Sequence, residues 1–441
     1  METIRIHALS RREFLQESAL TASLLGLGWT ATTAQGNPGK VEPLRIGAIG
    51  VGSQGQANLR TVLKVPGVTC VAVCDVFEPN LNAAKRIAQV PDDDAYTDYR
   101  KLLERKDIHA VIIATPLPLH APMTIDALNA GKHVFCEKLM AYTIEDAKEM
   151  ARTARRTGKV LQIGHSRRSS VSYNHAYELI HSKKVCGRIT HIRAQWNRNA
   201  SWRRTVPQGG RILAWQDYWK DPEHLVNWRL YKRTSQGLMA ELGSHQTHVA
   251  NWFLNEVPSA VCGMAGIDYW KDGREVWDNV QCIFEYPSGV KMIYQSITSN
   301  QFDGCSEEFM GDRGTLITIA GDGAKEKGLL YQEPKAETLD WAQYTAKEKG
   351  ANGKEGLVLN ASATKKLTTG AKIGETTLTT SAEDKTSYDL EFHNWAASIR
   401  EGKPVLCDAI EGLHATVPII KANEAMARGT RVEIPRHLYE I

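Results

Sequence analysis

A glycine-rich turn between an apolar strand and a helical stretch constrains this 441-residue chain more than any other feature. Residues 46–55 read Ile-Gly-Ala-Ile-Gly-Val-Gly-Ser-Gln-Gly, and a second apolar run, 68–74, ends at Asp75. Gly50 and Gly52 permit a tight turn and a close approach of backbone to a pyrophosphate, while Gly55 lets the helix pack on the strand. The order strand, turn, helix, strand predicts a dinucleotide-binding unit.

The residues around this turn indicate which dinucleotide is bound. Ser53 and Gln54 lie at the predicted helix N-terminus, whose free N–H groups and positive dipole attract phosphate. Asp75 is expected to accept hydrogen bonds from the ribose hydroxyls, and Glu78 to repel a 2′-phosphate. We therefore predict NAD rather than NADP. The alternative is a glycine turn in a nucleotide-free α/β domain.

The first 36 residues resemble a twin-arginine export signal. Ser10-Arg11-Arg12-Glu13-Phe14-Leu15 is followed by a stretch without charge from residue 18 to residue 39. Its apolar part is short and diluted by threonine, so we expect a removed signal and no stable membrane span. A folded, nucleotide-loaded protein exported to the periplasm is the prediction, and a chance Arg-Arg in a tail is the alternative.

Composition excludes several classes of protein. The chain has 42% hydrophobic and 24% charged residues and a net charge of +4 without a long basic run, so nucleic acid is not an expected partner. Eight cysteines are scattered without CxxC or a paired metal spacing. We expect buried thiols and no metal site.

Alternating strands and helices predict an α/β fold with two domains. The first, residues 44–165, has apolar strands at 45–49, 69–74, 110–114, 133–136 and 160–163, which is typical of a parallel Rossmann sheet. The second, residues 166–441, has strands at 189–196, 260–266, 281–286, 291–296 and 315–320 without helices at each crossover. This predicts an α+β domain with an open, mostly antiparallel sheet. A surface excursion is expected at 325–385, before helices at 388–400 and 409–428.

Further motifs identify a family resemblance. Thr115-Pro116, His120, the run 130–138 ending in Cys136-Glu137-Lys138, and Glu241-x-x-x-His245 together resemble the Gfo/Idh/MocA oxidoreductases. The resemblance implies an active site between a Rossmann domain and an open sheet. It also implies hydride transfer between a nicotinamide and a sugar or cyclitol carbon, and a homodimer or homotetramer.

The same resemblance suggests roles for individual residues. Lys138 would steady the developing alkoxide beside the nicotinamide, His245 would act as base, and Glu241 would orient the His245 imidazole. Glu137 would hold the cofactor ribose or orient Lys138. The cofactor set is completed by Thr115, His120 and His165.

Two positions differ from the family pattern, and both affect how far the family's residue roles apply to this chain. Leu139 replaces the usual proline, and we expect a trans peptide before it because a non-proline cis bond costs ~3 kcal/mol. His248 stands where several polyol dehydrogenases have a substrate-binding aspartate. We assign His248 to the substrate, together with Arg168 and Tyr173 at the domain junction.

Residues 196–277 hold eight of the eleven tryptophans, interleaved with arginines. Flat aromatic rings beside the forked N–H donors of arginine are suited to bind a sugar. We predict that Trp196 and Trp228 contact the substrate. Packing or oligomer contact is the alternative for each ring.

Three functions remain open. The first is an NAD-dependent sugar dehydrogenase or reductase. The second is a glycosidase that uses NAD transiently to oxidise a sugar carbon and eliminate the aglycone, although relatives of that kind lack the lysine found at Lys138. The third is a non-catalytic sugar sensor, which Lys138 and His245 disfavour.

Overall fold

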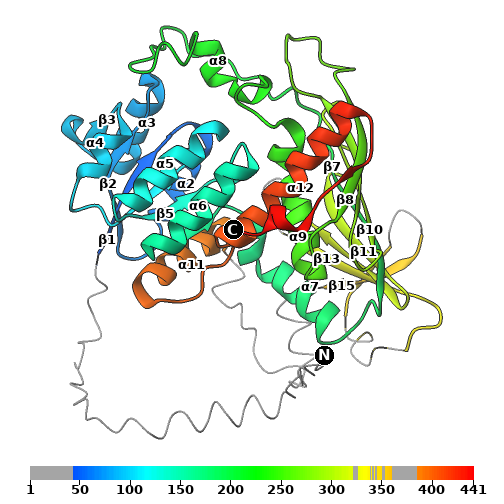
Figure 1. Cartoon of the computed structure of the whole chain (residues 1–441). Helices are drawn as coiled ribbons and strands as arrows, with labels where there is room; N and C mark the ends of the chain where they lie inside the picture. Colours follow the sequence, from blue (N-terminus) through cyan, green and yellow to red (C-terminus); the bar gives the residue numbers. More distant parts are fainter. Residues whose placement is uncertain are drawn as a thin grey trace, which may run out of the picture. The chain divides into compact units, whose positions relative to one another are not determined.

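The computed structural model describes residues 43–320, 326–337, 339, 342, 345–349, 353–359 and 385–441 (Figure 1). The export signal expected at residues 1–36 lies outside these residues. Within the described chain, no helix combines the length and the apolar character needed to cross a membrane.

The N-terminal sheet is parallel throughout and has the strand order β3-β2-β1-β4-β5-β6. Every predicted strand is found within two residues of its expected ends. Its strands are β1 (Leu44–Ile49), β2 (Val68–Cys74), β3 (Ala95–Tyr96), β4 (Ala110–Ile113), β5 (His133–Cys136) and β6 (Leu161–Ile163), and its helices are α2 (Ser53–Val62), α3 (Glu78–Ala88), α4 (Tyr99–Glu104), α5 (His120–Asn129) and α6 (Ile144–Thr157).

The glycine turn follows β1 and needs glycine for steric reasons. Gly50 has a φ of +76°, and a Cβ there would lie 2.7 Å from the backbone nitrogen of Thr115. A Cβ on Gly55 would lie 2.1 Å from the Gly50 oxygen. Strand β1 and helix α2 can therefore approach one another only with these two residues in place.

The second sheet has ten strands in the order β14-β15-β13-β12-β11-β7-β10-β9-β8-β16. All pairs are antiparallel except β7 with β10, so the sheet is mostly antiparallel as predicted. Its strands are β7 (Ile189–Trp196), β8 (Ala260–Gly266), β9 (Asn279–Glu285), β10 (Lys291–Ile297), β11 (Cys305–Gly311), β12 (Gly314–Ile319), β13 (Lys327–Gln332), β14 (Lys347–Lys349), β15 (Glu355–Leu359) and β16 (Val432–Glu433).

Two features of this sheet escaped the sequence reasoning. Strand β11 pairs with β7 in the middle of the sheet, but its polar sequence Cys-Ser-Glu-Glu-Phe-Met-Gly hides the strand pattern. The described part of the expected excursion at 325–385 forms β13, β14 and β15, which extend one side of the sheet instead of leaving it.

Several helices pack against the two sheets and connect them. The remaining α-helices are α7 (Val171–His181), α8 (Pro222–Val226), α9 (Ser244–Leu254), α11 (Ser387–Glu401) and α12 (Ala409–Arg428). Although α11 comes late in the sequence, it packs on the N-terminal sheet, where Phe392 lies 4.6 Å from Phe135 between ring centroids. Figure 1 shows α11, in orange, against the blue and cyan part of the chain. One buried apolar cluster continues from the N-terminal sheet through α6 and α12 to the second sheet.

Candidate active site

A cavity of about 470 Å³ lies at the carboxyl ends of β1, β2 and β4. Gly50, Gly52, Ser53, Gln54, Asp75 and Thr115 line it, as the sequence predicts for a nucleotide site. Helix α2 begins here without a side-chain cap and without an acidic residue in its first turn, so its N–H groups can bind a pyrophosphate. The buried Thr115 hydroxyl also has no hydrogen-bond partner among the described residues. These features fit NAD.

The Asp75 carboxylate lies in this cavity and is already held by the backbone. It accepts hydrogen bonds from Val51 N and Phe77 N, both at 2.8 Å, and burial raises its pKa to about 6. Glu78, which we expected to repel a 2′-phosphate, instead forms a two-pronged ion pair with Arg211 at 2.6 and 2.8 Å. Because Arg211 balances the charge of Glu78, Asp75 is left as the main group acting against NADP.

A second cavity of about 250 Å³ adjoins the first, and the two share Gln54, Thr115, Arg204 and Trp228. It brings together residues from both domains. Its lining includes His120, Glu137, Lys138, Trp196, Arg198, Trp202, Arg229, Glu241, His245 and Tyr388. The three predicted catalytic residues therefore meet in one cavity beside the nucleotide site.

Lys138 is fixed by backbone carbonyls of the second domain. Its Nζ donates to the Glu241 oxygen at 2.9 Å and lies 3.5 Å from the Ala240 oxygen. Both carbonyls belong to η5 (Met239–Gly243), a π-helical turn that precedes α9. The expectation of a trans peptide after Lys138 is wrong, because the Lys138–Leu139 bond is cis. Leu139 is only 1% exposed, so tertiary packing, which the sequence pattern does not contain, surrounds this peptide.

Glu241 does not orient His245 as we expected. Its Oε2 accepts from Arg229 Nε at 2.8 Å and lies 3.9 Å from Lys138 Nζ. A buried carboxylate needs a positive partner, and Arg229 and Lys138 both supply one. Arg229 and Lys138 therefore hold Glu241 ionised, and its charge acts on the lysine.

His245 is held in its neutral form. Burial, followed by the positive charges of Arg167 and Lys138, lowers its pKa well below the usual range. The ring is therefore neutral at physiological pH, and it lies 5.4 Å from the Trp196 ring between centroids. A neutral imidazole beside an ammonium group has the properties of a base and a charge stabiliser.

His120 and Glu137 support this arrangement from the nucleotide side. The His120 ring nitrogens lie 2.8 Å from the Leu139 oxygen and 2.9 Å from the Thr115 oxygen. Glu137 accepts from Asn58 at 2.8 Å and from the Lys138 backbone nitrogen at 3.1 Å. Both side chains thus fix the backbone that carries Lys138.

Comparison with known families agrees with this geometry. Residues 44–165 match the oxidoreductase family with an NAD-binding Rossmann fold that is named Gfo/Idh/MocA, and residues 187–434 match the C-terminal α/β domain of the same family. The chain belongs to the Gfo/Idh/MocA oxidoreductase family. Its N-terminal domain is the NAD-binding Rossmann domain of that family.

Curated relatives are similar over part of the chain. A glycosyl hydrolase family 109 protein of Shewanella sp. (strain W3-18-1) is 30% identical over 240 residues, which is 48% of this chain and 51% of that protein. The α-N-acetylgalactosaminidase of Shewanella oneidensis is 35% identical over 177 residues, 35% of this chain and 39% of that protein. The chain thus spans about half the length, or less, of these curated relatives.

Solved structures share the fold along most of the chain. The aldose-aldose oxidoreductase from Caulobacter crescentus with glycerol is 18% identical, covers 89% of this chain and all of its own, and has a TM-score of 0.66. Levoglucosan dehydrogenase with NADH and L-sorbose is 19% identical and has a TM-score of 0.68. The match covers 90% of this chain and the whole of the dehydrogenase chain.

Five predicted residues of this Gfo/Idh/MocA protein are absent from the linings of both cavities described above, and one of them, Gly55, serves the packing of α2 on β1. Tyr173 is buried and donates to Glu307 at 2.8 Å. His165 is fully buried, and its ring stacks on His248 at 4.4 Å and meets His245 edge-on at 5.7 Å. Arg168 and His248 line a separate cavity of about 710 Å³. Tyr173 and Arg168 are thus engaged by the carboxylates of Glu307 and Glu411.

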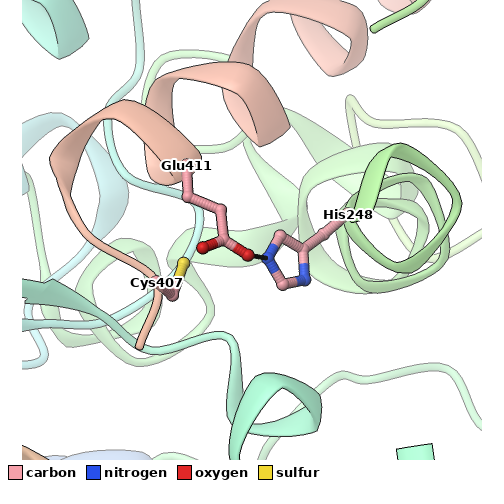
Figure 2. A group of neighbouring side chains, drawn as sticks. All are labelled: His248, Cys407 and Glu411. Atoms are coloured by element: carbon pink, nitrogen blue, oxygen red, sulfur yellow. Dashed lines mark hydrogen bonds and ion pairs between the residues drawn. The ribbon is translucent and has the colours of Figure 1, made fainter. Parts of the chain in front are cut away.

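Arg168 and His248 converge on the carboxylate of Glu411 in α12. Arg168 Nε and His248 Nε2 lie 3.1 and 2.8 Å from its Oε1. The possible metal-ligating atoms of His248, Cys407 and Glu411 all lie within 4.8 Å of one another, as a metal site would require. Figure 2 shows the carboxylate between the sulfur and the imidazole. Because Arg168 already balances the charge of Glu411, an ion pair and a hydrogen bond account for this cluster without a metal.

Sequence reasoning did not find two groups at the site. Asn58 bridges Gln54 Nε2 and Glu137, at 2.9 and 2.8 Å, and Tyr388 enters the second cavity from α11. Asn58 lies one helical turn after Gln54, which is a signal that was available. Tyr388 follows residues 360–384, and no local pattern connects it with Lys138.

Proposed function

We propose that this protein is an NAD-dependent oxidoreductase that transfers hydride between the nicotinamide and a hydroxyl or keto carbon of a sugar, sugar derivative or glycoside. One observation carries the proposal. Lys138 and a neutral His245 share a cavity that adjoins the nucleotide cavity. A base, a cation and a hydride acceptor are the three components that oxidation of a carbinol requires.

Each residue has a defined task in this reaction. Bound NAD supplies the hydride acceptor. His245 Nε2 or Nδ1 takes the hydroxyl proton, since the ring is held neutral. The Lys138 ammonium, fixed by the Glu241 and Ala240 carbonyls, stabilises the negative charge that develops on the substrate oxygen.

Aromatic rings around the cavity support a carbohydrate substrate. Trp196, Trp202 and Trp228 line it, and they can stack on the C–H faces of a pyranose. The solved structures of similar fold include enzymes described with L-sorbose, levoglucosan and scyllo-inositol. These descriptions agree with the aromatic lining.

A glycosidase that uses NAD transiently is the second candidate, and it matches the names of the glycosyl hydrolase family 109 relatives. In that reaction NAD is regenerated within each turnover, and the aglycone leaves by elimination. Lys138 counts against this function.

One experiment separates the two functions. The purified protein is mixed with NAD and a panel of aldoses, cyclitols and nitrophenyl glycosides, and NADH and nitrophenol are both recorded. NADH formed in proportion to oxidised sugar supports the dehydrogenase. Nitrophenol released without net NADH supports the glycosidase. Neither signal with any sugar would overturn both proposals and favour the sensor.

Export to the periplasm is part of the proposal. Arg11-Arg12 followed by a stretch without charge is the supporting observation. Cell fractionation of the intact protein and of an Arg11→Lys, Arg12→Lys variant tests it, and equal periplasmic amounts of the two would contradict it.

We also propose a homodimer or homotetramer. Ile283 on β9 and Ile293 on β10 are paired across the strands and are 44% and 49% exposed, and Met264 on β8 is 78% exposed. Apolar side chains gathered on one sheet face favour association. Light scattering after size-exclusion chromatography tests this, and a Ile293→Glu variant should shift the mass toward the monomer.

A further inference from the structure

Arg204 differs from the arginines that surround it. Arg203, next to it in the sequence, bonds Asp272 and Glu223, and Arg229 bonds Glu241. Arg211 is held by Glu78. Within the described residues, no hydrogen bond or ion pair joins the Arg204 guanidinium to a partner, although this side chain lines both cavities of the site.

The backbone of Arg204 is nevertheless held firmly. Its nitrogen donates to the Asn227 side chain at 2.7 Å, and its oxygen accepts from the same amide at 3.0 Å. Asn227 is only 2% exposed. The backbone of Arg204 is therefore fixed beside the site, while its guanidinium stays available to a ligand.

The charge balance of the catalytic cavity leaves Arg204 without an anion. Glu241 is already engaged by Arg229 and lies near Lys138, and Glu137 is engaged by Asn58 and a backbone N–H. Partial loss of hydration, followed by the like charge of Arg229, lowers the pKa of Arg204, and the negative charge of Glu241 offsets only part of this effect. A negatively charged group on the substrate would relieve this excess.

From this arrangement we infer that the substrate is an acidic sugar, a uronate or aldonate, whose carboxylate forms a forked ion pair with Arg204. The inference rests on the proposed function and specifies its substrate class. A guanidinium matches the geometry of a carboxylate with two parallel N–H···O bonds. Trp202 and Trp228, which line the same cavity, would cover the sugar ring.

Sugar binding to the protein loaded with NADH tests the inference without requiring turnover. Quenching of tryptophan fluorescence reports binding, and the probes are methyl glucoside with methyl glucuronide and methyl galactoside with methyl galacturonide. Within each pair the carboxylate is the difference. The acid should bind at least about tenfold more tightly than its neutral partner, as expected of a charge-assisted hydrogen bond.

Three variants identify the group responsible. Arg204→Gln should remove most of the preference for the acid, and Arg204→Lys, which keeps the charge and loses the fork, should keep part of it. Arg233→Gln makes the same charge change in the same segment outside both cavities and should leave the preference intact.

Two results would overturn the inference. Neutral sugars that bind as tightly as acids would do so, and so would an Arg204→Gln variant that weakens NADH and leaves the preference for the acid unchanged, since Arg204 would then serve the cofactor. Stronger binding of glucose 6-phosphate than of either acid would replace the carboxylate by a phosphate. Tight, Arg204-dependent binding of acids without any NAD reduction would instead contradict the proposed function.

Discussion

The two adjoining cavities of this molecule are built in different ways. In the nucleotide cavity, the residues that we assign to the phosphate and ribose lie between Gly50 and Thr115, along one edge of a parallel sheet, and second-domain residues such as Arg204 and Trp228 complete the lining. The catalytic cavity collects Glu137 and Lys138, Trp196, His245 and Tyr388 from both domains. A βαβ unit determines the geometry of the phosphate- and ribose-binding part of the first site, whereas only the complete tertiary fold produces the second.

This difference explains how the sites respond to sequence change. The nucleotide cavity depends on backbone shape, because its ligands are N–H groups and close approaches at glycine. The catalytic cavity depends on the charges and protonation states of a few side chains. Substitutions should therefore separate NAD affinity from the rate of hydride transfer.

The largest expected effect is on the rate. His245→Ala removes the neutral imidazole and should lower kcat by ~10²–10⁴-fold, with NAD affinity within about twofold of the native value. Rapid-mixing measurement of NADH formation, with NAD binding measured in parallel, checks both parts. His191→Ala, on the exposed side of β7, is the control. Turnover near the native rate would show that His245 is not the base.

Gly50→Ala should act on the other cavity. A Cβ there would lie 2.7 Å from Thr115 N in a backbone with a φ of +76°, so NAD should bind about a hundredfold more weakly, ~2.7 kcal/mol. Calorimetric titration with NAD measures this. Gly158→Ala is a matched control, because Gly158 also has a positive φ, +64°, but nothing lies within 4 Å of its added Cβ. Equal losses in both variants would indicate general destabilisation.

The two sites were not equally predictable from the sequence. Gly50, Asp75 and the strand positions of the Rossmann domain follow from spacing and periodicity, which are local properties. Glu241 was misjudged because its role was taken from the family pattern Glu241-x-x-x-His245, whereas η5 is a π-helical turn and Arg229 takes the carboxylate. Tyr388 and β11 depend on contacts between distant segments, and such contacts leave no periodic signal.

Glu241→Gln tests the role of the negative charge of Glu241 in the catalytic cavity. It removes the negative group 3.9 Å from Lys138 Nζ and leaves the Arg229 charge unbalanced. We expect kcat to fall about tenfold, ~1.4 kcal/mol, because Arg229, without its carboxylate partner, repels the Lys138 ammonium and displaces it from the substrate oxygen. Steady-state kinetics with saturating NAD checks this. A change in NAD affinity alone would assign Glu241 to the nucleotide site instead.

The pH dependence tests whether His245 is neutral in the working enzyme. Its lowered pKa means that the unprotonated base persists below the usual histidine value of about 6.5, and that activity is lost only when the pH falls through the lower pKa of the folded state. At pH 6, kcat/KM should remain within about twofold of its plateau. An acid limb centred at or above pH 6.5 would contradict the effect of burial and of Arg167 and Lys138.

The smallest effect on catalysis is expected for His248→Ala. Sequence resemblance assigned His248 to the substrate, but its Nε2 bonds Glu411 at 2.8 Å and the residue lines the separate 710 Å³ cavity. The KM for sugar should therefore stay within about twofold of the native value, while the lost hydrogen bond to a carboxylate lowers the free energy of unfolding by ~1–3 kcal/mol. Thermal unfolding and steady-state kinetics measure the two quantities. A large rise in KM at unchanged stability would mean that the His248 cavity, rather than the one around Lys138, receives part of the substrate.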